Sequence, residues 1–425
     1  MLKKLQASVL AALLVFLVVS TGRTQQLAGG PIPKPPTLCV NSVCPSSAPG
    51  PVSPTPPPPV TPQPSPSPSG AAVKWHPGTY VWTAGIPWAG AQDVVNGITA
   101  ICSNANITGV QVVLKWSILE GATAGDYSGG FAAVDAMLAK ARSCNKRVMV
   151  QIAERIFGTP TYTQSVGQLS ASFPAYLLTS NYGVCCGVLD ATGTELSFGG
   201  VVGSTANSDF YGEQAIARLW DPAVMDRLIA LSNAYAARYD GNPYFEMLSS
   251  GESAVPPFPS FWPTGYNTQV MRFHSSVAQA WPHTLNRMNL NFTLGDSTMK
   301  DFFELCLSLK NCVVGGPDPE IPLPNITRQI QANEIFRGAQ CSGCTARDYR
   351  GALAWVGEQE WLGLEDGVKE DTSLLTGYQK NTMHDSFMIW PDNSPRWPDV
   401  LAQINADNSV ATVACPSNFV GCNTN

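Results

Sequence analysis

The feature that most constrains the fold is a repeated alternation of short apolar segments and amphipathic segments after residue 73. Eight apolar runs, rich in Val, Ile and aromatic residues, have the length of buried strands: residues 79–83, 109–115, 147–153, 244–249, 285–292, 312–315, 352–356 and 387–390. Each precedes a segment with helical spacing of apolar residues: 91–103, 131–143, 222–239, 267–280, 298–309, 325–340, 374–384 and 397–405. Such alternation is typical of α/β folds with a parallel sheet.

Eight strand–helix units in residues 73–425 predict a single (β/α)8 TIM barrel. A doubly wound sheet is the alternative, but it usually has fewer units, and no glycine-rich fingerprint follows the first strand. Asp221 before Pro222 predicts the N-cap of the helix at 222–239. The stretch from the third strand to about Leu219 shows no clear period, and we expect a long irregular loop there.

The N-terminal residues have a different composition from the rest of the chain. Lys3 and Lys4 precede an apolar run over 5–20 and then small and polar residues, which predicts a secretory signal peptide at 1–24. An uncleaved single anchor is the alternative. Residues 25–72 are interpreted as a disordered Pro-rich linker, with 16 prolines between positions 31 and 70. Either interpretation predicts a secreted, cell-surface or periplasmic protein.

The chain has 12 cysteines, more than is typical of a cytosolic protein, and we expect disulfides. Cysteines expected to pair on sequence proximity or helix position are Cys102 with Cys144, Cys306 with Cys312, Cys341 with Cys344, and Cys415 with Cys422. Cys39 and Cys44 are expected to close a small loop in the linker. Cys185 and Cys186 bond either each other or separate partners.

Composition and motifs exclude several function classes. Charged residues make up only 13% of the chain and the net charge is −6, which disfavours binding to nucleic acid. The four histidines lack metal-ligand spacing, and the sequence contains no GxSxG, P-loop or HExxH motif. We therefore expect no metal and no cofactor, a monomer, and no membrane contact beyond the possible N-terminal anchor.

Polar and aromatic residues gather where the predicted strands end, which is where TIM barrels carry their active sites. The candidates for the site are Trp116, Glu154, Arg155, Glu252, Asn289, Asp318, Glu358, Glu360, Trp361 and Trp390. Indole faces stack on the C–H faces of sugar rings, and acids and amides hydrogen-bond sugar hydroxyls. This set therefore predicts an oligo- or polysaccharide as the binding partner.

Glu252 and Glu358 end the fourth and seventh predicted strands, on opposite sides of the barrel mouth. Glycoside hydrolysis uses one carboxylic acid to protonate the leaving oxygen and a second carboxylate to attack the anomeric carbon or activate water. The pair fits this requirement, although a single acid after a strand is often only a helix cap or a loop charge.

Residues 116–120 (WSILE) and 125–127 (GDY), followed by Phe131 and a helix with Asp135, resemble a W-x-x-L-E … G-x-Y segment. That segment occurs in the beta-galactosidase-like and cellulase-like members of the clan of retaining (β/α)8 glycosidases. The dipeptide Gly357-Glu358 resembles the G-E of strand seven in the cellulase-like families. The resemblance extends over most of residues 75–400.

The resemblance implies a glycoside hydrolase that acts with retention, with Glu252 as acid/base and Glu358 as nucleophile. It also implies that Trp390 lies under the sugar at the cleavage site. Retention would require carboxyl groups about 5–5.5 Å apart, whereas a separation of about 9 Å would indicate inversion.

The chain departs from the clan at Gly251, where members usually carry an Asn that contacts the sugar 2-hydroxyl. Ser250 or Asn289 are the candidates to replace it. Glu360 has the same strand parity as Glu358 and is the alternative nucleophile. The alternative function is a catalytically inactive barrel that binds carbohydrate or a protein at the cell surface.

Overall fold

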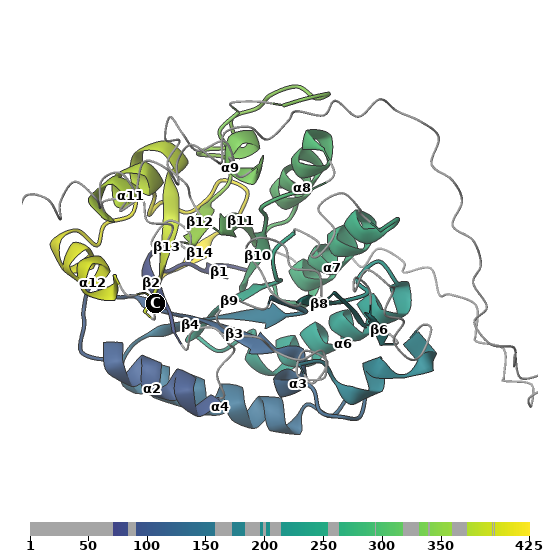
Figure 1. Ribbon diagram of the computed structural model, residues 1–425. Helices are drawn as coiled ribbons and strands as arrows, with labels where there is room; N and C mark the ends of the chain where they lie inside the picture. Colours follow the sequence, from purple (N-terminus) through teal and green to yellow (C-terminus); the bar gives the residue numbers. More distant parts are fainter. Residues whose placement is uncertain are drawn as a thin grey trace, which may run out of the picture. The chain divides into compact units, whose positions relative to one another are not determined.

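Eight parallel strands close into a barrel in the computed structural model of the protein (Figure 1). In order around the barrel they are β2 (Gly78–Trp82), β3 (Gly109–Lys115), β4 (Arg147–Ala153), β9 (Phe245–Ser249), β10 (Leu285–Asn289), β11 (Cys312–Pro317), β12 (Trp355–Glu358) and β13 (Asp385–Pro391). The structure describes residues 71–83, 91–157, 172–182, 196–198, 201–204, 214–253, 263–293, 295–317, 331–338, 341–358, 372–392, 394 and 396–425. The predicted (β/α)8 barrel is confirmed, and each predicted strand overlaps one strand of the barrel.

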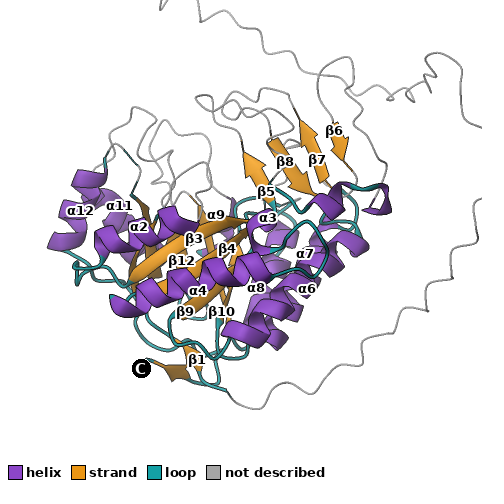
Figure 2. Ribbon diagram, turned by 90° about the horizontal axis from the view of Figure 1, so that it is seen from below, coloured by secondary structure: helices purple, strands orange, loops and turns teal. Residues whose placement is uncertain are grey.

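Helices cover the outside of the barrel (Figures 1 and 2). The main ones are α2 (Ala91–Ile101), α4 (Ser128–Ser143), α6 (Pro222–Tyr239), α7 (Tyr266–Ala280), α8 (Asp296–Ser308), α9 (Gln331–Phe336), α11 (Thr372–Tyr378) and α12 (Trp397–Ala406). The predicted cap of α6 is confirmed, because the Asp221 side chain accepts a hydrogen bond from the backbone N–H of Ala223 at 2.9 Å. The segment predicted as one helix at 374–384 is α11 followed by a π-helical turn, Gln379–Met383.

Alternation along the strands separates two buried layers. Tyr80, Trp82 and Ile389 belong to the cluster inside the barrel, whereas Val81 and Trp390 belong to the larger cluster that includes residues of the surrounding helices. Most strand residues are therefore buried on both faces, as parallel sheets require. Polar residues at inward positions consequently face one another across the barrel.

The prediction of a long irregular loop after the third strand is wrong for four short segments. Described residues of this stretch form a four-stranded antiparallel sheet in the order β5 (Arg155–Phe157), β8 (Gln214–Ala217), β7 (Val201–Ser204) and β6 (Leu196–Phe198). Strands of three or four residues are too short to show a period of two in the sequence. Figure 2 shows this sheet at the end of the barrel opposite β1 (Val73–Lys74), and β5 follows directly from the C-terminal end of β4.

The four predicted cysteine pairs are confirmed: Cys102–Cys144, Cys306–Cys312, Cys341–Cys344 and Cys415–Cys422. The last of these lies beside β14 (Cys422–Asn423), which pairs with β1. In the part of the chain that the structure describes, no helix has the length and apolar character needed to cross a membrane. The predicted signal peptide and residues 25–70 of the predicted linker, with Cys39 and Cys44, lie outside the described residues, and so do Cys185 and Cys186.

Candidate active site

Glu358 is the last residue of β12, and its side chain is 1% exposed inside the barrel. Gln111 Nε2 donates to one carboxylate oxygen of Glu358, and Arg287 Nη2 donates to the other at 2.8 Å. Gln111 lies on β3 and Arg287 on β10, neither of which is a neighbour of β12 in the barrel. These contacts therefore cross the barrel interior and fix both oxygens of Glu358.

Arg287 is the cation of this site and is 0% exposed. Its guanidinium also donates to Gln111 Oε1 at 2.8 Å and to Asn289 Oδ1 at 3.1 Å. An arginine cannot lose its proton in a protein, so its positive charge stabilises the Glu358 carboxylate. A buried ion pair persists only when hydrogen bonds compensate the loss of water, and the amides of Gln111 and Asn289 supply them here.

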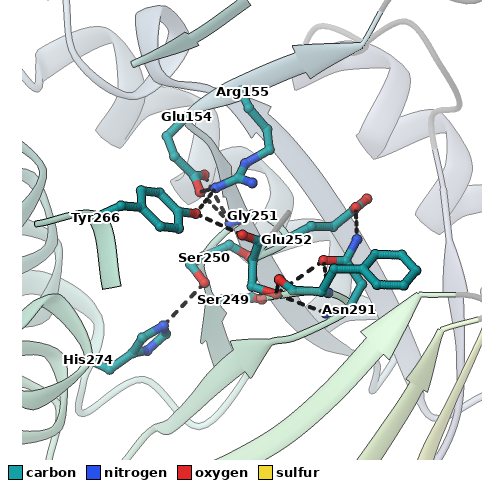
Figure 3. A network of polar contacts seen from close by, with 11 residues as sticks. Glu154, Arg155, Ser249, Ser250, Gly251, Glu252, Tyr266, His274 and Asn291 are labelled. Carbon is teal, nitrogen blue, oxygen red and sulfur yellow. Dashed lines mark hydrogen bonds and ion pairs between the residues drawn. The ribbon is translucent and has the colours of Figure 1, made fainter. Parts of the chain in front are cut away.

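Glu252 follows β9 by three residues and is half-buried. Asn291, which follows β10, donates from Nδ2 to Glu252 Oε2 at 2.5 Å (Figure 3). The amide of Asn291 is held in turn, because its Oδ1 accepts from the Ser253 hydroxyl at 3.1 Å. Glu252 is therefore oriented by a neutral amide and retains contact with solvent, unlike Glu358.

A network of buried polar residues lies behind Glu252 (Figure 3). Both carboxylate oxygens of Glu154 accept from the backbone N–H of Gly251, at 3.0 and 2.9 Å. Arg155 Nη2 donates to Glu154 at 3.2 Å and to the Tyr266 hydroxyl at 2.9 Å. Burial raises the pKa of Tyr266, so its hydroxyl keeps the proton that it donates to the Ser253 carbonyl oxygen at 3.1 Å.

His274, on α7, supports the same strand end from the helix layer. Its Nδ1 lies 2.9 Å from Asn286 Oδ1, and its Nε2 lies 3.3 Å from the Ser250 hydroxyl. The amide of Asn286 donates from Nδ2 to the His274 carbonyl oxygen, so Oδ1 faces the ring and Nδ1 carries the proton. Nε2 consequently accepts from Ser250. Burial lowers the pKa of His274 to about 4, and the hydrogen bond to Asn286 opposes this only in part.

We expect this histidine to make the protein less stable in mild acid. The unfolded chain binds a proton at His274 below pH ~6.5, whereas the folded protein does so only below about 4, so the free energy of unfolding falls as the pH drops between these values. The loss from this group is about 3 kcal/mol. Urea denaturation of the wild type and of His274→Gln at several pH values measures it. Equal pH slopes for the two proteins in this window would contradict the expectation.

The structure also places the other predicted site residues. Trp116 and Trp390 are 0% and 1% exposed in the outer hydrophobic cluster, and the indole N–H of Trp116 donates to Glu120 at 2.9 Å. Both indoles pack with residues of the surrounding helices, whereas Glu358 lies inside the barrel, so we leave both out of the proposed site. Asp318, Glu360 and Trp361 lie outside the described residues.

Glu154, Arg155 and Asn289 are brought together near Glu252, but they are 1–3% exposed. They line a small cavity of about 10 Å³, together with Ser250 and His274. Such a cavity has room for about one water molecule and none for a sugar ring. In this arrangement Glu154 and Arg155 support the chain before Glu252, whereas Asn289 accepts from Arg287.

Gln111, Arg287 and Asn291 hold the two glutamates, and Tyr266 holds Arg155 behind Glu252. None of these four is among the site candidates chosen from the sequence, although Asn291 lies near the end of the fifth predicted strand. The first two carry a detectable signal, since each is a polar residue at an inward position of a buried strand, in GVQVVLK and LNRMN. Trp82 was also missed, and it ends β2 in the interior cluster. Asn291 and Tyr266 lie in a loop and at a helix start, where polar residues are ordinary.

No family model matches the sequence, and no curated protein matches it. Among solved structures, the lactosyl-enzyme intermediate of endo-glycoceramidase II from Rhodococcus sp. is similar at 9% identity, over 77% of this chain and 76% of that one, with a TM-score of 0.47. The catalytic domain of a beta-amylase from Paenibacillus polymyxa is similar at 7% identity, over 75% and 93%, with a TM-score of 0.46. A structure described as a glycoside hydrolase is similar at 10% identity, over 76% of this chain and 88% of that one, with a TM-score of 0.41. Because these identities are 10% or lower and the TM-scores are below 0.5, we base the proposed function on the site residues alone.

Proposed function

We propose that the protein is a glycoside hydrolase that cleaves β-linked carbohydrate with retention, through Glu252 and Glu358. The observation that carries the proposal is the difference between the two carboxyl groups. Glu358 is buried and paired with a guanidinium, whereas Glu252 is half-buried and hydrogen-bonded to an amide. Two carboxyl groups in unlike environments at the C-terminal end of one barrel are suited to the two roles of glycoside hydrolysis.

In the first step Glu252 donates its proton to the glycosidic oxygen, and that oxygen leaves as an alcohol. A carboxylate oxygen of Glu358 forms a bond to the anomeric carbon as the glycosidic C–O bond breaks. Arg287 and Gln111 hold the attacking carboxylate in place at this stage. The product is a covalent glycosyl ester of Glu358.

In the second step Glu252 accepts a proton from water, and the water oxygen attacks the anomeric carbon. The ester bond to Glu358 breaks, and the sugar is released with its original anomeric configuration. The change of role is possible because ester formation removes the negative charge of Glu358, which makes ionisation of Glu252 easier.

A panel of 4-nitrophenyl β-glycosides and soluble β-linked polysaccharides tests the proposal. We expect turnover of at least one member, and ¹H NMR of the first product should show the β-anomer. Glu252→Gln tests the role of the acid. It should slow cleavage of an unactivated alkyl or polysaccharide substrate by roughly 10²–10⁴-fold. For a 2,4-dinitrophenyl glycoside, whose leaving group needs no proton, the first step (kcat/KM or the burst of dinitrophenolate) should be affected much less, whereas the second step stays slow.

Two other results of the glycoside panel would change the proposed function. An α-anomer formed first would replace retention with inversion. Binding of polysaccharide with no turnover of any member would contradict the proposal in favour of an inactive carbohydrate-binding barrel. Secretion of the protein remains a prediction of the N-terminal sequence and is tested by the N-terminus of the mature chain.

A further inference from the structure

We propose that Glu154 is a positioning residue that fixes Glu252 through the backbone of Gly251, and that it is the reason why residue 251 is glycine. The role of Glu252 in this inference rests on the proposed function. The contact between Glu154 and Gly251 does not, and it can be tested separately.

Hydrogen bonds tie the Glu154 side chain to the backbone before Glu252. Glu154 is 1% exposed, and both of its carboxylate oxygens accept from the Gly251 N–H, at 3.0 and 2.9 Å (Figure 3). Charge-assisted hydrogen bonds of this kind are stronger than neutral ones. Because Glu252 directly follows Gly251, fixing this peptide fixes the direction in which the Glu252 side chain leaves the backbone.

The Glu154 carboxylate also fills the volume beside Gly251. A Cβ atom added at Gly251 would lie 2.7 Å from both carboxylate oxygens of Glu154, closer than such atoms approach in proteins. The carboxylate is also held by Arg155, which is held by the Tyr266 hydroxyl at 2.9 Å. Glu154 thus occupies the volume that any larger side chain at 251 would need.

A similar close approach of a buried carboxyl occurs before the other glutamate. Gly357 precedes Glu358, and a Cβ atom added there would overlap a carboxyl oxygen of Asp385. Asp385 is 0% exposed on the neighbouring strand β13, and burial raises its pKa well above the ordinary value. In both places a buried carboxyl fills the position that a side chain before the assigned glutamate would need. The carboxyl of Asp385, the first residue of β13, has no hydrogen-bond partner among the described residues, so of the two carboxyls only that of Glu154 also holds the glycine backbone.

Glu154 also has an electrostatic effect on Glu252. Arg155 interacts with the charges of both Glu154 and Glu252. With Glu154 in place, part of the positive charge of Arg155 is compensated. Without the charge of Glu154, Arg155 acts more strongly on Glu252 and favours its ionised form, in which it cannot serve as the acid.

A double-mutant cycle tests the contact without any substrate. We expect Gly251→Ala to lower the folding equilibrium constant on the order of tenfold or more, because it forces a clash in a packed site. In a Glu154→Asp background the side chain is one methylene shorter and the carboxylate lies farther from residue 251. There Gly251→Ala should lower the folding equilibrium constant much less. Gly241→Ala is the matched control, since an added Cβ there meets nothing within 4 Å.

A pH–rate profile on the best aryl glycoside of the panel tests the positioning role. In Glu154→Gln, which keeps the volume and loses the charge, the alkaline limb should move about one unit or more to lower pH. Glu154→Asp should keep the limb in place. A purely structural role would lower the rate by the same factor at every pH, and that result, or an additive cycle, overturns the inference. If no glycoside is hydrolysed, the proposed function fails, and the cycle still decides whether Glu154 requires the glycine.

Discussion

Glu358→Ala is expected to reduce the turnover of the best glycoside on the order of 10⁴-fold, the largest effect that we anticipate. The substitution removes the carboxylate that attacks the anomeric carbon, and Asn, Gln and Arg neighbours cannot replace it. It also leaves Arg287 buried without its anion, so loss of activity must be separated from loss of fold.

Sodium azide provides that separation. The space left by Glu358 admits a small anion, which attacks the anomeric carbon of a dinitrophenyl β-glycoside from the face that Glu358 occupied. The product is the α-glycosyl azide with 2,4-dinitrophenolate as the leaving group, and its formation requires a folded site. Glu246→Gln is the matched control, because Glu246 is equally buried but contacts His76 at the other end of the barrel. Near-normal turnover by Glu358→Ala would assign the nucleophile to Glu360.

Arg287→Met is expected to lower the free energy of unfolding by about 3–5 kcal/mol. The methionine fills most of the space, but Glu358 is left as an uncompensated charge in the barrel interior with one donor fewer. The double variant with Glu358→Met should recover most of the loss, since well-packed apolar residues often replace a buried ion pair without net cost.

Chemical denaturation monitored by circular dichroism measures the free energy of unfolding of Arg287→Met and of the double variant with Glu358→Met. Arg238→Met is the matched control, because Arg238 forms a comparable ion pair with Asp135 on the surface, where both side chains are about half exposed, and little change is expected. A loss for Arg287→Met no larger than that of the control would show that Arg287 does not stabilise a charged Glu358.

The barrel could be predicted because its signal is long and repeated. Eight apolar runs with β-branched residues, separated by amphipathic helices, leave few other packings, and one imprecise boundary does not change the number of units. The antiparallel sheet from β5 to β8 was missed for the opposite reason. Its strands have three or four residues, and their pairing depends on partners up to 61 positions away (Arg155 with Ile216).

The candidate site was predicted in part. The position after a strand marked Glu252 and Glu358 as residues of one rim, since strand order in a barrel follows from chain order. The same rule selected Trp116 and Trp390, whose burial in the outer cluster depends on side-chain direction and on the helices that pack over them. Their indole surfaces serve the hydrophobic core of the protein.

The sequence by itself determined the barrel, four of its cysteine pairs and the chemical type of the rim, because these follow from local period, spacing and residue class. Tertiary structure alone decided which groups hold each glutamate. Gln111 and Arg287 reach Glu358 across the barrel from sites 247 and 71 residues away in the chain. Glu154 closes on Gly251 from 97 residues away. Such contacts form only when the barrel closes and the side chains point inward. The distance between these residues along the sequence therefore does not predict that they touch.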